Sequence, residues 1–199
     1  GEPDRHSPEA DAAFAAAIKR HGRVVLAAHK RITAELDADS AASEASTMSW
    51  YPSPAGGVGS LQPVQSLNFT PPLAMFAEGA SGVGYVDIAP DADGVYRRVQ
   101  PLRGGYDGRI YPHFATEIAR LASGTAPEEI VGRIPEDELE IAGRKLHIAG
   151  GNMLINYSGP TGTIPRYSFW EVLSGQVSGE QFAGKIVLVG ASAPGLYDI

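Results

Sequence analysis

The chain holds two aspartates, a glycine and two arginines in one short segment, Asp91-Ala-Asp-Gly-Val-Tyr-Arg-Arg98. Carboxylates two residues apart can bind calcium. An EF-hand loop, however, needs a third oxygen ligand before its glycine and a glutamate further along, and here Arg97 and Arg98 follow instead. Because a type I turn favours aspartate at its first position and glycine at its last, we interpret Asp91, Asp93 and Gly94 as structural residues of a turn.

The two arginines of this segment are candidates for anion binding. Neighbouring side chains of a strand point to opposite faces, so only one of Arg97 and Arg98 can face a given pocket. The alternative is a surface or cross-strand ion pair with Asp87 or Asp91, and we favour it over an anion site. On this interpretation Arg97 and Asp87 are structural residues as well.

A second candidate for chemistry is Ser192, which follows an apolar run in the sequence Gly190-Ala-Ser-Ala-Pro194. The G-x-S-x-G pattern of a nucleophile elbow fails at Pro194, and no helix-forming sequence follows. We therefore expect a loop at the end of a strand, with Gly190 as a structural residue. A hydrolase that uses Ser192 stays an alternative hypothesis.

No group of residues has the spacing of a metal or cofactor site. The chain has no cysteine, which excludes disulfides, thiolate nucleophiles and zinc sites built on sulfur. Each Gly-x-Gly pair lacks the third glycine of a dinucleotide-binding loop. Five histidines show no metal spacing and are interpreted as ordinary imidazoles: His6, His21, His29, His113 and His147. We expect no metal and no cofactor.

Composition indicates an ordinary globular domain. The 199 residues are 43% hydrophobic and 20% charged, which suits one sizeable core. A net charge of -7 makes nucleic acid a poor partner. No apolar run is long enough to span a membrane, and no signal peptide opens the sequence, so we expect a soluble fragment.

The elements that position these residues begin with a predicted helix. Ser7 is a capping residue and Pro8 suits the first turn, while Gly22 marks the end of the helix. Phe14 and Ile18 fall on one face of it. The apolar residues that follow suit a buried strand.

Periodicity weakens after this strand and returns only near residue 72. Long segments without periodicity are uncommon in compact domains and are often mobile or functional. We predict high mobility around residues 37–60 and a short helix near residues 72–77.

Hairpins and helices alternate in the second half of the chain. Residues 84–88 and 95–102 flank the turn and predict a hairpin. A helix is predicted over residues 111–122, and a second hairpin over residues 138–148.

The last predicted elements are a strand at residues 153–157, a helix that starts with a capping box formed by Ser168 and Glu171, and a strand at residues 184–190. The Val/Ile/Leu run of the strand at residues 184–190 is typical of a central strand buried on both faces. The order predicts an α/β fold in which helices and β-hairpins pack on a mixed β-sheet. We expect a single domain over residues 1–199.

A small ligand would bind beyond the end of the strand predicted at residues 186–189, because open α/β sheets bind ligands at the carboxyl ends of their strands. Ser192 and Asn156 would converge there with Arg98. The alternative, which we favour for Asn156 and Asp87, is a hydrogen bond that tethers a loop.

Four segments in this order resemble the type 2 cyclase/histidine-kinase-associated sensory extracellular domain, the CHASE type 2 domain. They are Glu2-Pro3 with residues 11–18; Gly84-Tyr85-Val86-Asp87 with Asp91-x-Asp93-Gly94-Val95-x-Arg97-Arg98; Ile155-Asn156-Tyr157-x-Gly159-Pro160; and residues 184–192 with Gly195-Leu196-x-Asp198. The resemblance runs from end to end of the chain.

The resemblance implies a non-enzymatic sensor on the periplasmic side of a bacterial membrane receptor, joined by flanking membrane helices to a cytoplasmic nucleotide cyclase, histidine kinase or serine/threonine kinase. It implies no catalytic residues and no particular ligand, so the signal is an unknown small molecule or protein. Family members normally carry further strand and helix segments before the position of Gly1. We therefore expect that the chain lacks the N-terminal part of this fold and exposes a sheet edge that can pair with another chain. A protein-interaction or homodimerisation module is the alternative hypothesis.

Overall fold

The computed structural model describes residues 7–30, 47–61, 63–64, 69–105, 107–160 and 162–191. The chain divides into two compact units, Gly1–Ile155 and Asn156–Ile199, called here the first unit and the second unit. The segment predicted to be mobile lies in part, at residues 37–46, outside the described residues. Among the described residues, no helix combines the length and the apolar character needed to cross a membrane.

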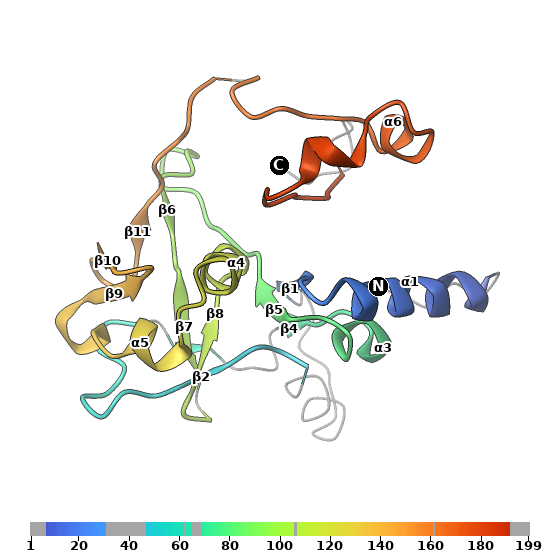
Figure 1. The fold of residues 1–199 in the computed structure, drawn as a ribbon. Helices are drawn as coiled ribbons and strands as arrows, with labels where there is room; N and C mark the ends of the chain where they lie inside the picture. Colours follow the sequence, from blue (N-terminus) through green and yellow to red (C-terminus); the bar gives the residue numbers. More distant parts are fainter. Residues whose placement is uncertain are drawn as a thin grey trace. The chain divides into compact units, whose positions relative to one another are not determined.

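The first unit opens with the helix and strand that the sequence predicts (Figure 1). Helix α1 (Pro8–His21) ends at Gly22, whose φ of 68° lies in the left-handed region that suits glycine. The predicted cap is wrong, because the Ser7 side chain makes no capping hydrogen bond. Its ψ of 70° departs from the value near 150° at His113 and Ser168, two residues whose side chains do cap helices.

A parallel strand pair follows α1. Strand β1 (Val25–Lys30) runs beside β5 (Gly82–Tyr85), with Ala28 opposite Tyr85. Strand β4 (Phe69–Thr70) joins the far end of β1 in antiparallel pairing, which makes a three-stranded mixed sheet. The short helix predicted before β5 is present as α3 (Ala74–Ala77).

A four-stranded sheet has the order β2-β8-β7-β3. Strands β7 (Leu102–Gly105) and β8 (Arg109–Pro112) form its antiparallel centre. Strand β2 (Tyr51–Pro52) pairs antiparallel with β8, and β3 (Pro63–Val64) pairs parallel with β7. Helix α4 (Phe114–Ser123) begins later than the sequence predicts, because the residues just before it belong to β8.

The hairpin predicted around the 91–94 turn is wrong. The turn itself forms, since the Gly94 N–H donates to the Asp91 carbonyl oxygen at 2.8 Å and Gly94 has a φ of 81°. Strand β5 pairs with β1, however, and β6 (Arg98–Val99) pairs antiparallel with β11 (Met153–Leu154). Both strands therefore pair with strands from elsewhere in the chain and not with each other. Strand β11 is also shorter than the predicted strand at residues 153–157.

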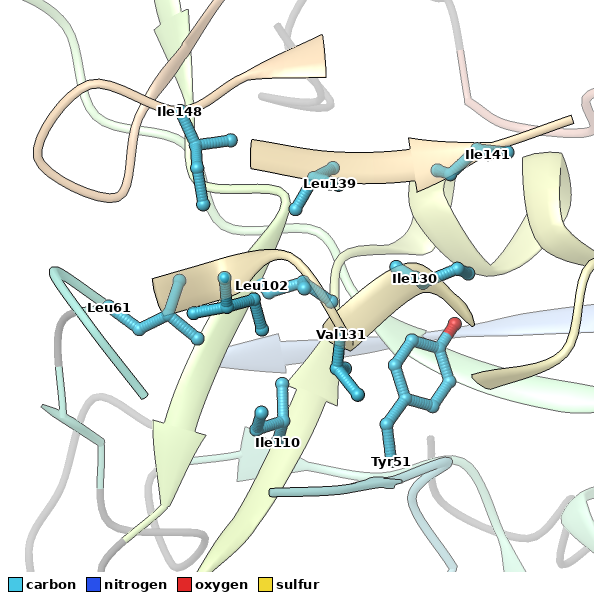
Figure 2. Packing of buried hydrophobic residues seen from close by; sticks show 10 residues of the cluster. Tyr51, Leu61, Leu102, Ile110, Ile130, Val131, Leu139, Ile141 and Ile148 are labelled. Carbon is cyan, nitrogen blue, oxygen red and sulfur yellow. The ribbon is translucent and has the colours of Figure 1, made fainter. Parts of the chain in front are cut away.

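The larger hydrophobic cluster lies between the four-stranded sheet and the elements that follow α4 (Figure 2). Helix α5 (Pro127–Val131), the 3-10 turn η2 (Ile134–Glu136) and strand β9 (Glu138–Ile141), which forms the predicted hairpin with β10 (Arg144–His147), supply half of its members. Its members are Tyr51, Leu61, Leu102, Ile110, Ile130, Val131, Ile134, Leu139, Ile141 and Ile148.

A smaller cluster packs against the parallel strand pair and is rich in aromatic rings. Its members are Ala28, Met48, Phe69, Val83, Tyr85 and Tyr111. Tyr85 is fully buried, and its ring stacks on Phe69 with 5.4 Å between centroids and an interplanar angle of 16°. Such a stacked pair stabilises the fold by about 1 kcal/mol beyond the area that it buries.

The second unit has little regular structure. Helix α6 (Phe169–Leu173) starts with the predicted capping box of Ser168 and Glu171, and the 3-10 turn η3 (Gly179–Phe182) follows. The prediction of a buried central strand at residues 184–190 is wrong. Its four largest side chains are mostly exposed: Ile186 62%, Val187 50%, Leu188 71% and Val189 82%. A Val/Ile/Leu run becomes a buried strand only where other strands flank it, and no strand is present among the described residues of this unit.

Candidate functional site

The structure places the three predicted ligand-binding residues in different parts of the chain. Arg98 lies in β6 of the first unit, exposed. Asn156 opens the second unit and is also exposed. Ser192 lies outside the described residues. The expected convergence of these side chains therefore stays a prediction.

Carboxylates of the turn bind both arginines that follow it. The Arg98 guanidinium lies 2.6 Å from Asp91, and that of Arg97 lies 3.2 Å from Asp91 and 2.8 Å from Asp93. The hydrogen bond from Arg97 lowers the pKa of the Asp93 carboxyl below its usual value. Both arginines and Asp93 are exposed to water, so solvent screening makes these ion pairs weak contributors to stability. Their charges are satisfied by one another.

A polar cluster that the sequence analysis did not predict surrounds the ring of Tyr85. We call it the Tyr85 cluster and define it as Tyr85, Gln100, Arg103 and His113. The Tyr85 hydroxyl donates to the Gln100 carbonyl oxygen at 2.5 Å. The His113 ring meets the Tyr85 ring edge to face with 5.2 Å between centroids, and the Arg103 guanidinium carbon lies 4.6 Å from the Tyr85 centroid.

Secondary structure brings the Tyr85 cluster together at the carboxyl end of the parallel strand pair. Tyr85 is the last residue of β5, and His113 forms an isolated parallel bridge with it at the start of α4. Arg103 lies in β7, opposite Tyr111. The carboxyl ends of parallel strands are where open α/β sheets bind ligands. The ligand site predicted from the sequence also lies at the carboxyl end of a strand, but at other residues.

His113 caps helix α4 with one ring nitrogen and holds its other nitrogen in the interior. Its Nδ1 accepts a hydrogen bond from the Ala115 N–H at 3.1 Å, so the neutral ring carries its proton on Nε2. Nε2 is buried and has no hydrogen-bond partner in the part of the chain that the structure describes. Burial, with a smaller contribution from the charge of Arg103, lowers the pKa of His113 to about 4.

Arg103 is held in place by two contacts. Its Nε donates to the Gln100 side-chain oxygen at 2.6 Å, and its guanidinium packs over the Tyr85 ring. Burial raises the pKa of the Tyr85 hydroxyl far above its usual value; the charge of Arg103 opposes this rise and that of Asp87 adds to it. The charges of Arg103 and Asp87 therefore both act on the Tyr85 hydroxyl.

A second polar network, also not predicted from the sequence, joins α4 to strand β2 and to Ser49. The Glu117 carboxylate is 1% exposed and accepts from the Tyr51 hydroxyl at 2.6 Å and the Ser49 hydroxyl at 3.1 Å. It also accepts two hydrogen bonds from Arg120, each of 2.9 Å. A Cβ atom on Gly82 would lie 2.3 Å from a Glu117 oxygen. This network is satisfied internally, and we assign it to stability.

One sequence signal could have pointed to the Tyr85 cluster. His113 directly follows a proline and directly precedes a helical pattern, which is a helix-capping position. Nothing local indicates that Arg103 and Tyr85 would meet it, because their contact depends on the pairing of β7 with β8 and of β5 with β1.

Mixed sheets with helices packed beside them define an α/β domain. The described residues contain no metal-ligating cluster. A family model for the CHASE2 domain matches residues 1–199, and the chain belongs to this family of extracellular sensory domains. Neither the comparison with curated proteins nor the one with solved structures found a match. A sensory domain is not a catalytic one, which agrees with the expected absence of enzymatic activity.

Proposed function

We propose that the chain is the input domain of a bacterial membrane receptor, lies on the periplasmic side, and controls a cytoplasmic cyclase or kinase through flanking membrane helices. The observation that carries this proposal is the family match over residues 1–199. The Tyr85 cluster supports it, because the buried His113 Nε2 lies at the carboxyl end of parallel strands and has no hydrogen-bond partner among the described residues, which suits ligand binding.

A ligand transmits a signal only if it binds one state of the receptor more tightly than the other. Equal affinity for both states leaves their populations unchanged, whereas a shift from 1:99 to 99:1 needs about a 10⁴-fold preference. The input domain therefore needs two arrangements that its ligand distinguishes, and the flanking membrane helices would carry the difference to the output domain.

Thermal unfolding of the purified chain with small metabolites tests ligand sensing. A ligand at a hundred times its dissociation constant stabilises the folded state by about 2.7 kcal/mol, which raises the melting temperature of a chain of this size by about 5–10 °C. If no compound raises the melting temperature at any concentration, the isolated chain is not a small-molecule sensor.

The full receptor tests signal transmission. In membrane vesicles, a compound that stabilises the purified chain is expected to change the cyclase or kinase activity. Binding to the chain with no change of activity would contradict the proposed input role.

Dimerisation is a second candidate function, favoured by the exposed apolar surface of the second unit. The exposed side chains are Tyr157, Ile164, Tyr167, Phe169, Trp170, Val172, Leu173, Ile186, Val187, Leu188 and Val189. Surfaces of this kind mark interaction sites, and a second copy of the chain supplies an identical apolar run to pair with. Light scattering tests this directly: the wild type should be a dimer and Val187→Lys a monomer. A monomeric wild type at high concentration would contradict it.

A further inference from the structure

The Arg103 guanidinium is held in place, but only part of its hydrogen-bonding capacity is used. Its Nε is bound by Gln100 and its face by the Tyr85 ring. In the ranges that the structure describes, its two terminal nitrogens donate to no carbonyl oxygen or carboxylate. By contrast, Arg97 and Arg120 each bind carboxylates. Arginine in such a state presents a planar pair of N–H donors that matches a carboxylate.

His113 supplies a second donor beside the same ring. Its Nδ1 is taken by the Ala115 N–H, so the proton is on the buried Nε2, which has no partner among the described residues. A buried donor without a partner destabilises a protein, so native structures rarely keep one without a reason. Arg103 and His113 both contact Tyr85, at 4.6 Å and 5.2 Å from its centroid.

The charges near the cluster favour a ligand with one negative charge. Arg103 supplies the one positive charge that would pair directly with a ligand, because His113 is neutral near pH 7. A second negative charge on the ligand would have no cation to pair with, and the nearby Asp87 carboxylate, which acts on the Tyr85 hydroxyl, would repel it. A single carboxylate matches the one guanidinium in both charge and shape.

We propose that the Tyr85 cluster binds the carboxylate group of a small monoanionic ligand, which accepts hydrogen bonds from the terminal nitrogens of Arg103 and from His113 Nε2. This rests on the proposed sensory function and adds the chemical class of the ligand to it. The Gln100 side-chain oxygen orients Arg103 by accepting from its Nε. The hydrogen bond from the Tyr85 hydroxyl to the Gln100 carbonyl oxygen fixes the ring that both donors contact.

Side-chain NMR of the full chain tests the proposal, with sodium acetate as the probe and sodium chloride added to keep the ionic strength constant. The Arg103 Nε–H and His113 Nε2–H signals are expected to shift together along one saturation curve. Inorganic phosphate at pH 7.5 should bind at least several-fold more weakly. The site is contradicted if acetate shifts neither signal up to 100 mM, or if phosphate binds as tightly.

Three variants separate the site from general charge effects. Arg103→Gln should weaken acetate binding at least about tenfold, because a hydrogen bond to a charged group is lost. Arg144→Gln, at an exposed arginine in β10, should leave it unchanged. His113→Asn keeps a capping side chain but removes the Nε2 donor, and should weaken binding severalfold in a chain whose thermal unfolding shows it folded. Equal effects of Arg103→Gln and Arg144→Gln would overturn the proposal.

The site and the sensory role fail separately. Acetate binding that leaves the output of the full receptor unchanged contradicts the sensory role and keeps the site. A receptor output that responds to another stimulus, with no acetate binding to the chain, contradicts the site and keeps the sensory role.

Discussion

All buried apolar side chains among the described residues belong to the first unit, whereas the second unit exposes most of its large ones. In the first unit, two clusters are closed by sheets and helices that come from distant parts of the sequence. In the second unit, helix α6 has a complete capping box, yet Trp170 within it is 71% exposed. Hydrogen bonds between residues three apart are enough to start a helix, whereas burial needs partners from elsewhere in the chain.

This difference bears on function. The first unit holds polar groups in fixed positions, as recognition of a ligand requires, and the Tyr85 cluster is its clearest example. The second unit presents an extended apolar run at residues 186–189 with no strand beside it. Exposed runs of this kind pair readily with another strand. The contrast is the basis for proposing ligand binding by the first unit and association by the second.

The largest expected effect comes from Glu117→Ala in the first unit. Removing this carboxylate leaves Arg120 and the Tyr51 hydroxyl without their acceptor, which should lower the free energy of unfolding by about 3–5 kcal/mol. Urea denaturation followed by tryptophan fluorescence measures it. Glu180→Ala, at an exposed position in the second unit, should change it by less than about 0.5 kcal/mol. Similar values for both variants would contradict the buried network.

Truncating a leucine to alanine in each unit gives the second-largest expected change in the free energy of unfolding. Leu102→Ala removes a fully buried side chain and should lower the free energy of unfolding by about 2–5 kcal/mol. Leu188→Ala removes one that is 71% exposed and should change it by less than about 0.5 kcal/mol. A large loss for Leu188→Ala in a monomeric sample would show that the second unit buries this residue.

His113 should make the stability of the first unit depend on pH. Its folded-state pKa of about 4 lies below the unfolded value of 6.5, so the unfolded chain binds more protons between these limits. The contribution is complete above pH 6.5 and is lost as the pH falls to 4, by at most about 3 kcal/mol. Urea denaturation of the wild type and His113→Asn at pH 7.5, 5.5 and 4.5 isolates it. A constant difference between the two proteins would contradict the burial of this ring.

Two glycines give the smallest effect. A Cβ on Gly84 would lie 2.6 Å from the Phe114 Cα, so Gly84→Ala should destabilise the chain by about 1–3 kcal/mol. Gly190 has nothing within 4 Å of that position, and Gly190→Ala should be neutral. Thermal unfolding compares them, and a neutral Gly84→Ala would contradict the close packing of β5 against the start of α4.

Elements whose signals are local were predicted well from the sequence. Gly22 marks the end of α1, and Ser168 with Glu171 marks the start of α6. The hairpin of β9 and β10 also forms as predicted, because its two short strands and the turn between them are adjacent.

Elements whose partners are distant in the sequence were predicted poorly. The turn at Asp91 was correct, but its flanking strands pair with β1 and β11 instead of with each other. The Tyr85 cluster was missed for the same reason, since Arg103 and His113 meet Tyr85 only through strand pairing. The run at residues 186–189 has the composition of a buried strand, but composition does not supply the neighbouring strands that burial requires.

Hydrogen exchange of the full chain, with and without saturating sodium acetate, tests the central claim most directly. The amides of β1, β5 and β8 should be protected, those of residues 186–189 should exchange at nearly unfolded rates in the monomer, and acetate should add protection around Arg103 and His113. Strong protection of residues 186–189 in the monomer, or acetate protection that spares the Tyr85 cluster, would contradict the assignment of ligand binding to the first unit and association to the second.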